Sequence, residues 1–372
     1  MITKTTADHI ELRNLARTFL AERAPLSQTR QFLDTGFDSG AWRLMGKELG
    51  LQGLALPEEY GGAGLGPVEL AVVLEEMGRV LYSGPYFSSI VLAAHVLLAT
   101  GVAGQRAAHL PALADGSATA ALAFAEPGSP WDGATAATSW RSEGGRYLLS
   151  GSKTLVIDGA GSDLLIVTAA AAGGPASALT FYLVRPGTSG VAVSRLPSFD
   201  QTRGLAAIEL DGAEGELLGE PGGAAPLLAT TLRRAAILLA AEQLGAARRC
   251  LEMSVEYAGL RTQFGRAIGS FQAIKHRCAD MLLDVETAAS AVSLALAELA
   301  AGVDVAEAAS LARAHCSDVL TRVASGTVQV HGGIGFTWEH DAQLYLKRAK
   351  SSELLLGSPA QHRELLARAI GL

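Results

Sequence analysis

The chain has 372 residues, of which 49% are hydrophobic and 18% charged, and its 30 Lys and Arg against 37 Asp and Glu give a formal net charge of −7. This length allows two or three domains with sizeable cores. Charged residues usually make up about a quarter of a soluble domain, so the low charge predicts large cores or surface buried by a partner. The acidic balance, without a stripe rich in Lys and Arg, excludes nucleic acid and anionic membrane surfaces as main partners.

No targeting or metal-binding pattern stands out. Charged and polar side chains interrupt the first 23 residues, so the N-terminus does not read as a signal peptide, and no uninterrupted apolar run reaches the ~18 to 20 residues of a membrane span. The three cysteines lie far apart without metal-ligand spacing: Cys250, Cys278 and Cys316. We therefore expect a cytoplasmic protein with buried, reduced thiols and no bound metal.

The first part of the chain has helical periodicity. Apolar residues recur with the spacing of a one-sided amphipathic helix within 12–20 and again within 70–81, on either side of a glycine-rich connector that ends at Pro67. These patterns predict an N-terminal α-helical domain over residues 1–116.

Short β-prone runs follow, separated by Gly, Pro and Asp: 146–157, 164–168, 179–184 and 205–210. They predict a small central β-domain, a barrel or sandwich, over residues 117–222. Beyond the Gly- and Pro-rich stretch 219–226, long segments rich in Ala and Leu predict a C-terminal helical bundle domain over residues 223–372. The fold class is therefore α+β.

A polar turn, Arg261-Thr262-Gln263-Phe264-Gly265, separates two long predicted helices, and Phe271-Gln272 begins the second. A guanidinium beside a helix N-terminus suits a phosphate, because both the fork geometry and the helix dipole favour an anion. The same pattern also fits a simple helix-hairpin turn with an arginine cap. The turn by itself leaves both interpretations open.

A glycine-rich segment follows another predicted helix at Gln329-Val330-His331-Gly332-Gly333-Ile334-Gly335-Phe336. Paired glycines let a backbone approach a ligand closely, and Gln offers a donor and an acceptor to a nucleobase edge. The alternative is a helix C-cap with left-handed glycines. A dinucleotide fingerprint is excluded because a helix, not a strand, precedes the glycines. His331 has no partner at metal or triad spacing, which predicts a packed or capping residue.

These motifs, together with Pro57-Glu58-Glu59-Tyr60-Gly61-Gly62 and the turn Glu126-Pro127-Gly128, resemble in their order those of the acyl-CoA dehydrogenase family. The family has a Pro-Glu-x-Tyr/Phe-Gly-Gly segment, a Thr-Glu-Pro-Gly-Ala-Gly-Ser-Asp loop, an Arg-x-x-Phe-Gly turn and a Gln-x-x-Gly-Gly-x-Gly segment. The resemblance spans nearly the whole chain. It implies a fold with an N-terminal helical domain, a small β-domain and a C-terminal four-helix bundle.

The resemblance also implies an FAD-dependent oxidoreductase acting on the CH–CH group of an acyl-CoA thioester. In this family a carboxylate removes the α-proton while hydride leaves the β-carbon, and hydrogen bonds to the thioester oxygen stabilise the charge that develops. The residues that it implies as contacts to the FAD of a neighbouring subunit are Arg261, Phe264, Gln272, Gln329, Gly332 and Gly333.

Both positions at which the family carries its catalytic base are apolar in this chain. Alignment of the segment after the Gly-Gly motif puts Leu356 at the usual site, and Ala235 occupies the alternative site on the first helix of the C-terminal domain. Glu242 lies seven residues after Ala235, ~10 Å along a helix, and Glu353 lies about one turn before Leu356. Each is a candidate for a relocated base, with a surface or ion-paired carboxylate as the alternative.

The chain's own flavin cradle also departs from the family. Leu155-Val156-Ile157 stands where the family has Trp-Ile-Thr against the flavin ring, and Ala125 replaces the Thr before the Glu-Pro-Gly turn. The groups offered to a neighbour's FAD are kept, whereas those that would hold its own are not.

This combination resembles the base-deficient subunits of heterotetrameric (α2β2) acyl-CoA dehydrogenases of bacterial steroid degradation. We expect a non-catalytic subunit that completes the FAD site of a paralogous partner acting on a bulky acyl-CoA, with an electron-transfer flavoprotein as the implied acceptor. Two alternatives stay open. One is a self-sufficient homotetrameric enzyme with a relocated base, and the other is a redox-inactive homologue that binds a CoA thioester.

Overall fold

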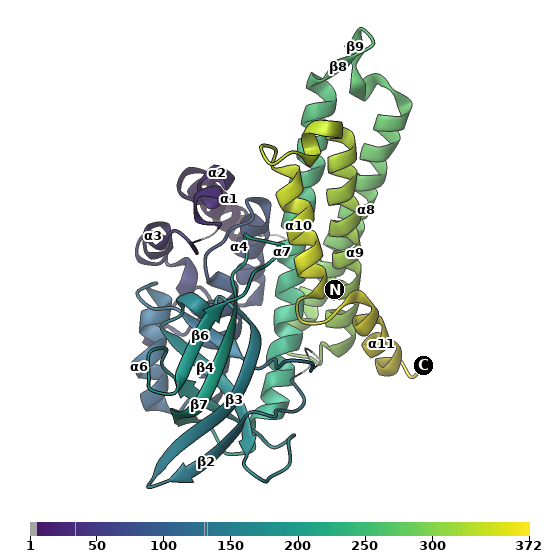
Figure 1. Cartoon of the computed structure of the whole chain (residues 1–372). Coiled ribbons are helices and arrows are strands. Elements are labelled where there is room, and N and C mark those ends of the chain that lie inside the picture. The colour runs from purple at the N-terminus through teal and green to yellow at the C-terminus, as the bar shows by residue number, and fades with distance from the viewer. Residues whose placement is uncertain (1–5, 34, 130, 132) are drawn as a thin grey trace. The chain divides into compact units, whose positions relative to one another are not determined.

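The computed structural model describes residues 6–33, 35–129, 131 and 133–372 (Figure 1). Helices extend to Ala114, strands run from Ala120 to Leu218, and helices resume at Ala224. The predicted order of helices, strands and helices is confirmed.

Contacts divide the chain into two compact units that do not follow this order. The first unit comprises Met1–Gln31, Pro67–Tyr82 and Ala236–Leu372, and the second comprises Phe32–Gly66 and Ser83–Ala235. Helix α7 (Ala224–Leu260) contributes to both units, because the division falls within it.

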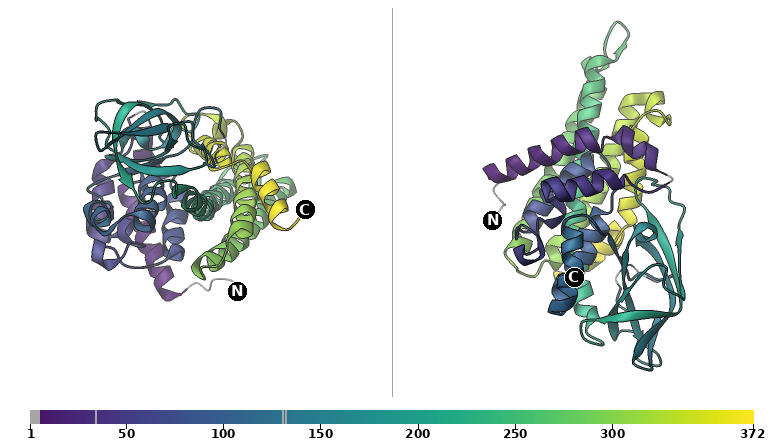
Figure 2. Two further views of the ribbon diagram at one scale, coloured as in Figure 1. Left: turned by 90° about the horizontal axis from the view of Figure 1, so that it is seen from below. Right: turned by 90° about the vertical axis from the view of Figure 1, so that its left-hand side faces the viewer.

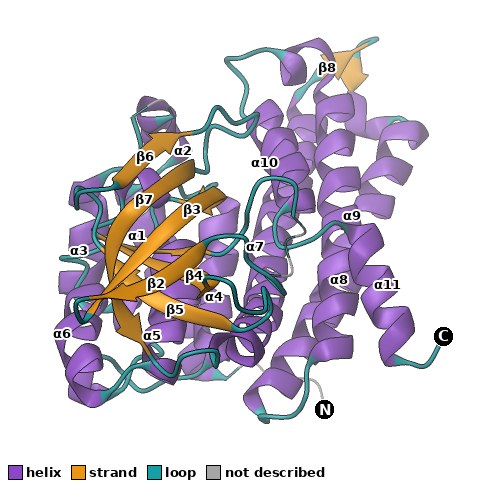
Figure 3. Ribbon diagram, turned by 60° about the horizontal axis from the view of Figure 1, so that its bottom comes forward, coloured by secondary structure: helices purple, strands orange, loops and turns teal. Residues whose placement is uncertain are grey.

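The second unit is built on one mixed sheet of seven strands. Strand β5 pairs with both β7 and β4, so the order β4-β2-β3-β7-β5 closes into a small barrel, with β1 beside β4 and β6 beside β7 (Figure 3). The strands are β1 (Ala120–Ala123), β2 (Ser139–Glu143), β3 (Arg146–Ile157), β4 (Leu164–Ala171), β5 (Leu179–Val184), β6 (Val191–Arg195) and β7 (Leu205–Leu218).

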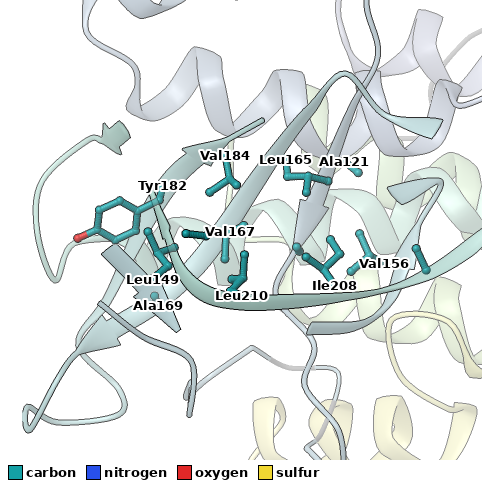
Figure 4. Close-up of a cluster of buried hydrophobic side chains, with 13 residues drawn as sticks. Ala121, Leu149, Val156, Leu165, Val167, Ala169, Tyr182, Val184, Ile208 and Leu210 are labelled. Carbon is teal, nitrogen blue, oxygen red and sulfur yellow. The ribbon is translucent and has the colours of Figure 1, made fainter. Parts of the chain in front are cut away.

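A continuous apolar core fills the barrel. Alternate residues of the strands point inward, as their period of two dictates, so that Leu149, Val167 and Ile208 are fully buried together with Tyr182 (Figure 4). The helices of this unit are α3 (Ser39–Leu49), α5 (His95–Thr100), α6 (Ala103–Ala114) and the start of α7, with a π-helical segment at Phe87–Ala94.

The first unit is helical. In it α9 packs against α8, α10 and α11, and the later part of α7 runs beside them, which gives the bundle at the right of Figure 1. The left view of Figure 2 shows the same helices from below. The helices are α1 (Ala7–Arg23), α2 (Leu26–Thr29), α4 (Pro67–Arg79), α8 (Gln272–Ala300), α9 (Ala306–His331), α10 (Ala342–Leu354) and α11 (Pro359–Ala369).

Among the described residues, one helix, α7, is long and apolar enough by length and composition to cross a membrane. More than half of its most apolar stretch, 56%, is buried inside the protein. Charged residues interrupt it, and Glu242 among them is buried in the fold. The helix therefore has the properties of a core helix.

Two glycines allow α4 and α7 to cross at close range. A Cβ built at Gly245 of α7 would collide with the carbonyl oxygen of Glu75, and one built at Gly78 of α4 would collide with that of Glu242. Because both obstacles are backbone atoms, no side-chain rotation can relieve them. The crossing therefore depends on the absence of side chains at these two positions.

We predict that Gly245→Ala lowers the free energy of unfolding by about 1 to 3 kcal/mol, because the added methyl group must push two helices apart. Gly259→Ala is the matched control on the same helix, where a Cβ meets nothing within 4 Å. It should be neutral or stabilise by up to about 1 kcal/mol through helix propensity. Urea unfolding followed by circular dichroism measures both. Equal stability of the two variants would contradict the close crossing.

Candidate functional site

The connection between α7 and α8 is a hairpin at one end of the bundle (Figure 1). Strand β8 (Thr262–Gln263) pairs with β9 (Arg266–Ala267), and the two residues at the tip, Phe264 and Gly265, have φ of 52° and 76°. Two consecutive positive φ values define a type I′ turn. Phe264 is 90% exposed, so the fold holds an apolar ring outward in a backbone conformation that is unfavourable for a residue with a Cβ.

Three polar side chains at this end of the bundle are exposed to solvent. Arg261 precedes the hairpin, Gln272 begins α8, and Gln329 lies in the last turn of α9. Within the described part of the chain, none of the three forms a side-chain hydrogen bond or ion pair. The guanidinium can bind a phosphate with two parallel hydrogen bonds, and each amide offers a donor and an acceptor.

Open backbone follows Gln329 in the chain, in the 3₁₀ segment Gly332–Phe336 after α9. Gly332 has a φ of 64°, and no atom lies within 4 Å of a Cβ built at Gly332 or at Gly333. The adjacent His331 is buried, donates from Nδ1 to the Thr327 carbonyl over 2.8 Å, and stacks on Tyr257 of α7 with ring centroids 4.3 Å apart. The prediction that His331 is a packed residue is confirmed.

The two expected base positions hold no proton acceptor on their side chains. Leu356 is 6% exposed in the loop after α10, and Ala235 is fully buried in α7. Leu356 also has a φ of 58°, which is unusual for a residue with a branched side chain.

Several polar groups hold the loop of Leu356 in this conformation. The buried Arg313 of α9 donates to the carbonyl oxygens of Ser352 and Leu355, and His362 Nε2 donates to the Leu356 carbonyl over 3.0 Å. The loop geometry is thus fixed by charge-assisted hydrogen bonds rather than by the side chain of residue 356.

Both candidate carboxylates are already bound to cations. Glu242 is buried and lies 2.9 Å from Nη1 of Arg348, which is 2% exposed. Glu353 accepts from Lys350 over 2.8 Å and from Thr321 over 3.3 Å. Removing one partner of a buried ion pair leaves an uncompensated charge, so Glu242 has a structural role opposite Arg348.

The strand expected to face the flavin ring is irregular. The pairing of β3 with β7 shifts register between Lys153 and Val156, and Leu155 within this shift has a φ of 53°. The Ala125 carbonyl accepts from the Thr154 amide over 2.9 Å. Leu155 and Ala125 offer neither an aromatic ring nor a hydroxyl at this place.

Sequence reasoning missed a buried ion pair behind that strand. Lys153, fully buried, lies 2.6 Å from Glu126, whose carboxylate also accepts from the amides of Ala137 and Thr138. Burial lowers the pKa of Lys153 to about 8, and Lys153 together with the donated hydrogen bonds lowers the pKa of Glu126 against its own burial. The sequence could have indicated this burial, because Lys153 lies four residues after Leu149 on β3 and side chains an even number apart on a strand point to the same side.

Arg313 was missed for a similar reason. It falls on the apolar stripe of α9 with Ala309, Cys316 and Leu320, at helical spacing, so its burial could have been read from the sequence. Its partners could not, because the carbonyl groups of Ser352 and Leu355 belong to a distant loop.

The chain matches known domain families over most of its length. Residues 6–117 match the acyl-CoA dehydrogenase N-terminal domain, and residues 225–371 match the acyl-CoA dehydrogenase C-terminal domain. Acyl-CoA dehydrogenase IpdE2 of Mycolicibacterium smegmatis is 37% identical over 335 residues, which cover 90% of this chain and 88% of that protein.

Solved structures agree with this relationship. The Tcur3481-Tcur3483 steroid ACAD is similar with a TM-score of 0.87 and 31% identity over 98% of this chain and 97% of the other. The ChsE4-ChsE5 complex from Mycobacterium tuberculosis gives 0.89 and 28% over 100% and 99%. The chain belongs to the acyl-CoA dehydrogenase family, whose members are FAD-dependent flavoproteins that oxidise the CH–CH group of acyl-CoA thioesters.

We predict that His362 makes the protein acid-sensitive. Burial and the nearby Arg313 lower the pKa of His362 to about 4, from an ordinary value of 6.5. The unfolded chain therefore binds a proton more readily between these two values, and stability falls as the pH drops from 6.5 towards 4. The loss reaches on the order of 2 to 3 kcal/mol at this site.

The variant His362→Gln keeps an amide that can donate to the Leu356 carbonyl but cannot titrate. Urea unfolding between pH 7 and pH 4 should show a smaller decline for the variant than for the wild type. Parallel declines would mean that His362 is not held neutral in the folded protein.

Proposed function

We propose that this chain is the non-catalytic subunit of an FAD-dependent acyl-CoA dehydrogenase and completes the FAD site of a paralogous partner in an α2β2 heterotetramer. The observation that carries this proposal is an asymmetry. Both base positions are apolar and buried at Leu356 and Ala235, whereas Arg261, Gln272 and Gln329 are exposed and their side chains bond to no other described residue. The chain therefore lacks a catalytic base at both expected positions but keeps the residues expected to contact FAD.

The kept residues fit the adenosine diphosphate half of FAD. Arg261 supplies a fixed positive charge for the diphosphate. Gln272 and Gln329 supply amide groups that can hydrogen-bond to the polar edges of the adenosine moiety. Gly332 and Gly333 leave space for a ligand to approach the backbone, and Phe264 holds an apolar surface outward. FAD supplies the hydride acceptor of the family's reaction.

The missing catalytic base explains why this chain would need a partner for turnover. Removal of an α-proton requires a free carboxylate within reach of the substrate, and general-base catalysis depends on that geometry first. The two candidates, Glu242 and Glu353, are bound to Arg348 and Lys350. A paralogue that carries a glutamate at the position of Leu356 would supply the missing group.

The relatives support the type of assembly and substrate. One solved neighbour is a complex of two differently named chains, ChsE4 and ChsE5, and another is a steroid ACAD. We extend both properties to this chain, with a bulky steroid-derived acyl-CoA as the substrate of the assembly, a cytoplasmic location, and an electron-transfer flavoprotein as the acceptor.

We predict that the chain purified alone retains little flavin and does not oxidise acyl-CoA. Co-expressed with a glutamate-bearing paralogue encoded nearby, it should form an α2β2 assembly with half the flavin of a homotetramer. Flavin absorbance and subunit stoichiometry by native mass spectrometry measure this. Full flavin occupancy and turnover by this chain alone would refute the proposal. In that case, loss of turnover in Glu242→Gln or in Glu353→Gln would identify the relocated base.

A second prediction concerns the FAD contacts. Arg261→Gln should weaken retention of flavin by the assembly by about ten- to a hundredfold, because charge-assisted hydrogen bonds to phosphate are lost. Arg266→Gln is the matched control in the same hairpin, since that guanidinium lies over the Phe271 ring at 4.1 Å. Flavin dissociation during dilution, followed by fluorescence, distinguishes the variants. Equal retention would remove Arg261 from the site.

A further inference from the structure

Positive charge is concentrated where α7 passes through the hairpin into α8. Residues 257–279 include no Asp or Glu, and their basic side chains are all exposed: Arg261, Arg266, Lys275, His276 and Arg277. The whole chain, by contrast, has a formal net charge of −7. We call residues 261–277 the basic segment. A net acidic molecule thus presents a local cationic surface at one end of its bundle.

The basic side chains of this segment are not neutralised by the described part of the chain. None of them forms an ion pair with a described residue, and the guanidinium of Arg266 lies over the Phe271 ring at 4.1 Å. Other exposed cations of the first unit do have acidic partners, as Arg322 has in Asp284 over 2.7 Å. The basic segment therefore keeps its charge for groups outside this surface.

The position of these cations does not stabilise the helix that carries them. Lys275 lies in the first turn of α8, where the helix dipole is positive and favours acidic side chains. The first turns of α1 and α9 follow this rule with Asp8 and Glu307. In α8 the fold would gain from a carboxylate where it has an ammonium group. The charge at this place therefore indicates a role in recognition.

Exposed apolar side chains accompany the charge. Phe264 at the tip of the hairpin is 90% exposed and meets Phe271 edge-on, and Leu260 at the end of α7 is 83% exposed. An apolar anchor within a charged rim is the usual composition of a protein interface. The hairpin projects beyond the end of the bundle (Figure 1), whereas small molecules bind in concave sites. This surface therefore suits contact with another protein chain.

We propose that the basic segment is a docking surface for an acidic patch on the partner subunit. This inference rests on the proposed function, which provides that subunit. The diphosphate of FAD is a small dianion, and the four permanent cations of the segment exceed its charge. Arg261 is assigned to that diphosphate, so Lys275 and Arg277 remain for carboxylates of the partner. Complementary charge of this kind speeds encounter and selects among partners.

Competition between two forms of the chain for one partner tests the proposal. The wild type and the double variant Lys275→Glu/Arg277→Glu, distinguished by mass, are co-expressed with a limiting amount of the glutamate-bearing paralogue. Native mass spectrometry of the purified α2β2 assembly counts each form. The wild type should outnumber the variant by at least about tenfold, because reversed charges meet the acidic patch with repulsion. Equal incorporation would overturn the proposal.

Salt provides a second measure of the same contact. On dilution in ~50 mM salt, the assembly of the variant should dissociate at a concentration about tenfold higher than that of the wild type, and the difference should vanish near ~0.5 M salt. A difference that persists in high salt would mean that the substitutions alter shape and not charge, which would also overturn the proposal.

Two control variants separate local charge from other effects. Arg43→Glu/Lys47→Glu makes the same charge change at exposed positions of α3 and should compete as the wild type does. If it is excluded equally, net charge alone decides the pairing and the docking surface is refuted. Lys275→Arg/Arg277→Lys keeps the charge and should also match the wild type. The reversed variant should melt no lower than the wild type, because it places acidic groups near the N-terminus of α8.

Two further readouts separate this proposal from the half-site assignment. Flavin per assembly should stay at the wild-type level in Lys275→Glu/Arg277→Glu, and its loss would mean that these side chains bind the cofactor instead of the partner. If the wild type assembles only with itself, the proposed function fails, and the reversal is then measured on the homotetramer. Weaker self-assembly would make a second copy the occupant of the surface, whereas unchanged self-assembly would refute the surface itself.

Discussion

The close packing of α7 against α4 is the constraint on which the first unit depends. Because Gly78 and Gly245 have no side chains, the two helices approach until each faces the other's carbonyl groups. This approach brings the α4 carboxylates Glu75 and Glu76 against arginines of α1 and α7, with Arg13 bonded to both. The buried carboxylates of α4 are thus each paired with arginine.

Three charged residues on α7 or just beyond its end differ in their burial and in their pairing. Arg234 is half-buried in the second unit and its Nε has no hydrogen-bond partner among the described residues, Glu242 is buried and paired with Arg348 in the first, and Arg261 follows the end of the helix in solvent. A buried pair holds the fold, whereas exposed or unpaired groups are available to a ligand. The separation between structural and available charge is therefore set by where each residue falls along one helix.

Much of the fold could be predicted from the sequence. Apolar periodicities of 3.6 and 2 located the helical and strand regions, because each period reflects local backbone geometry. The exposed candidates Arg261, Gln272 and Gln329 could be named because motifs of short range carry them. The partner of Glu242 could not be named, since Arg348 lies on another helix and is brought to it by helix packing. The partner of Glu353 could have been, because Lys350 lies three residues earlier on the same helix. For the buried pair of Lys153 and Glu126, the sequence indicated only that Lys153 points to the same side of its strand as the buried Leu149.

The sequence by itself determined that Leu356 and Ala235 cannot accept a proton, because this property belongs to the side chain whatever its surroundings. It also determined the family motifs and the order of the elements. Only the tertiary structure decided that Glu242 is held by Arg348 and that Arg313 fixes the loop of Leu356. Hydrogen bonding and desolvation depend on which atoms surround a group in space, and those atoms come from segments far apart in the chain.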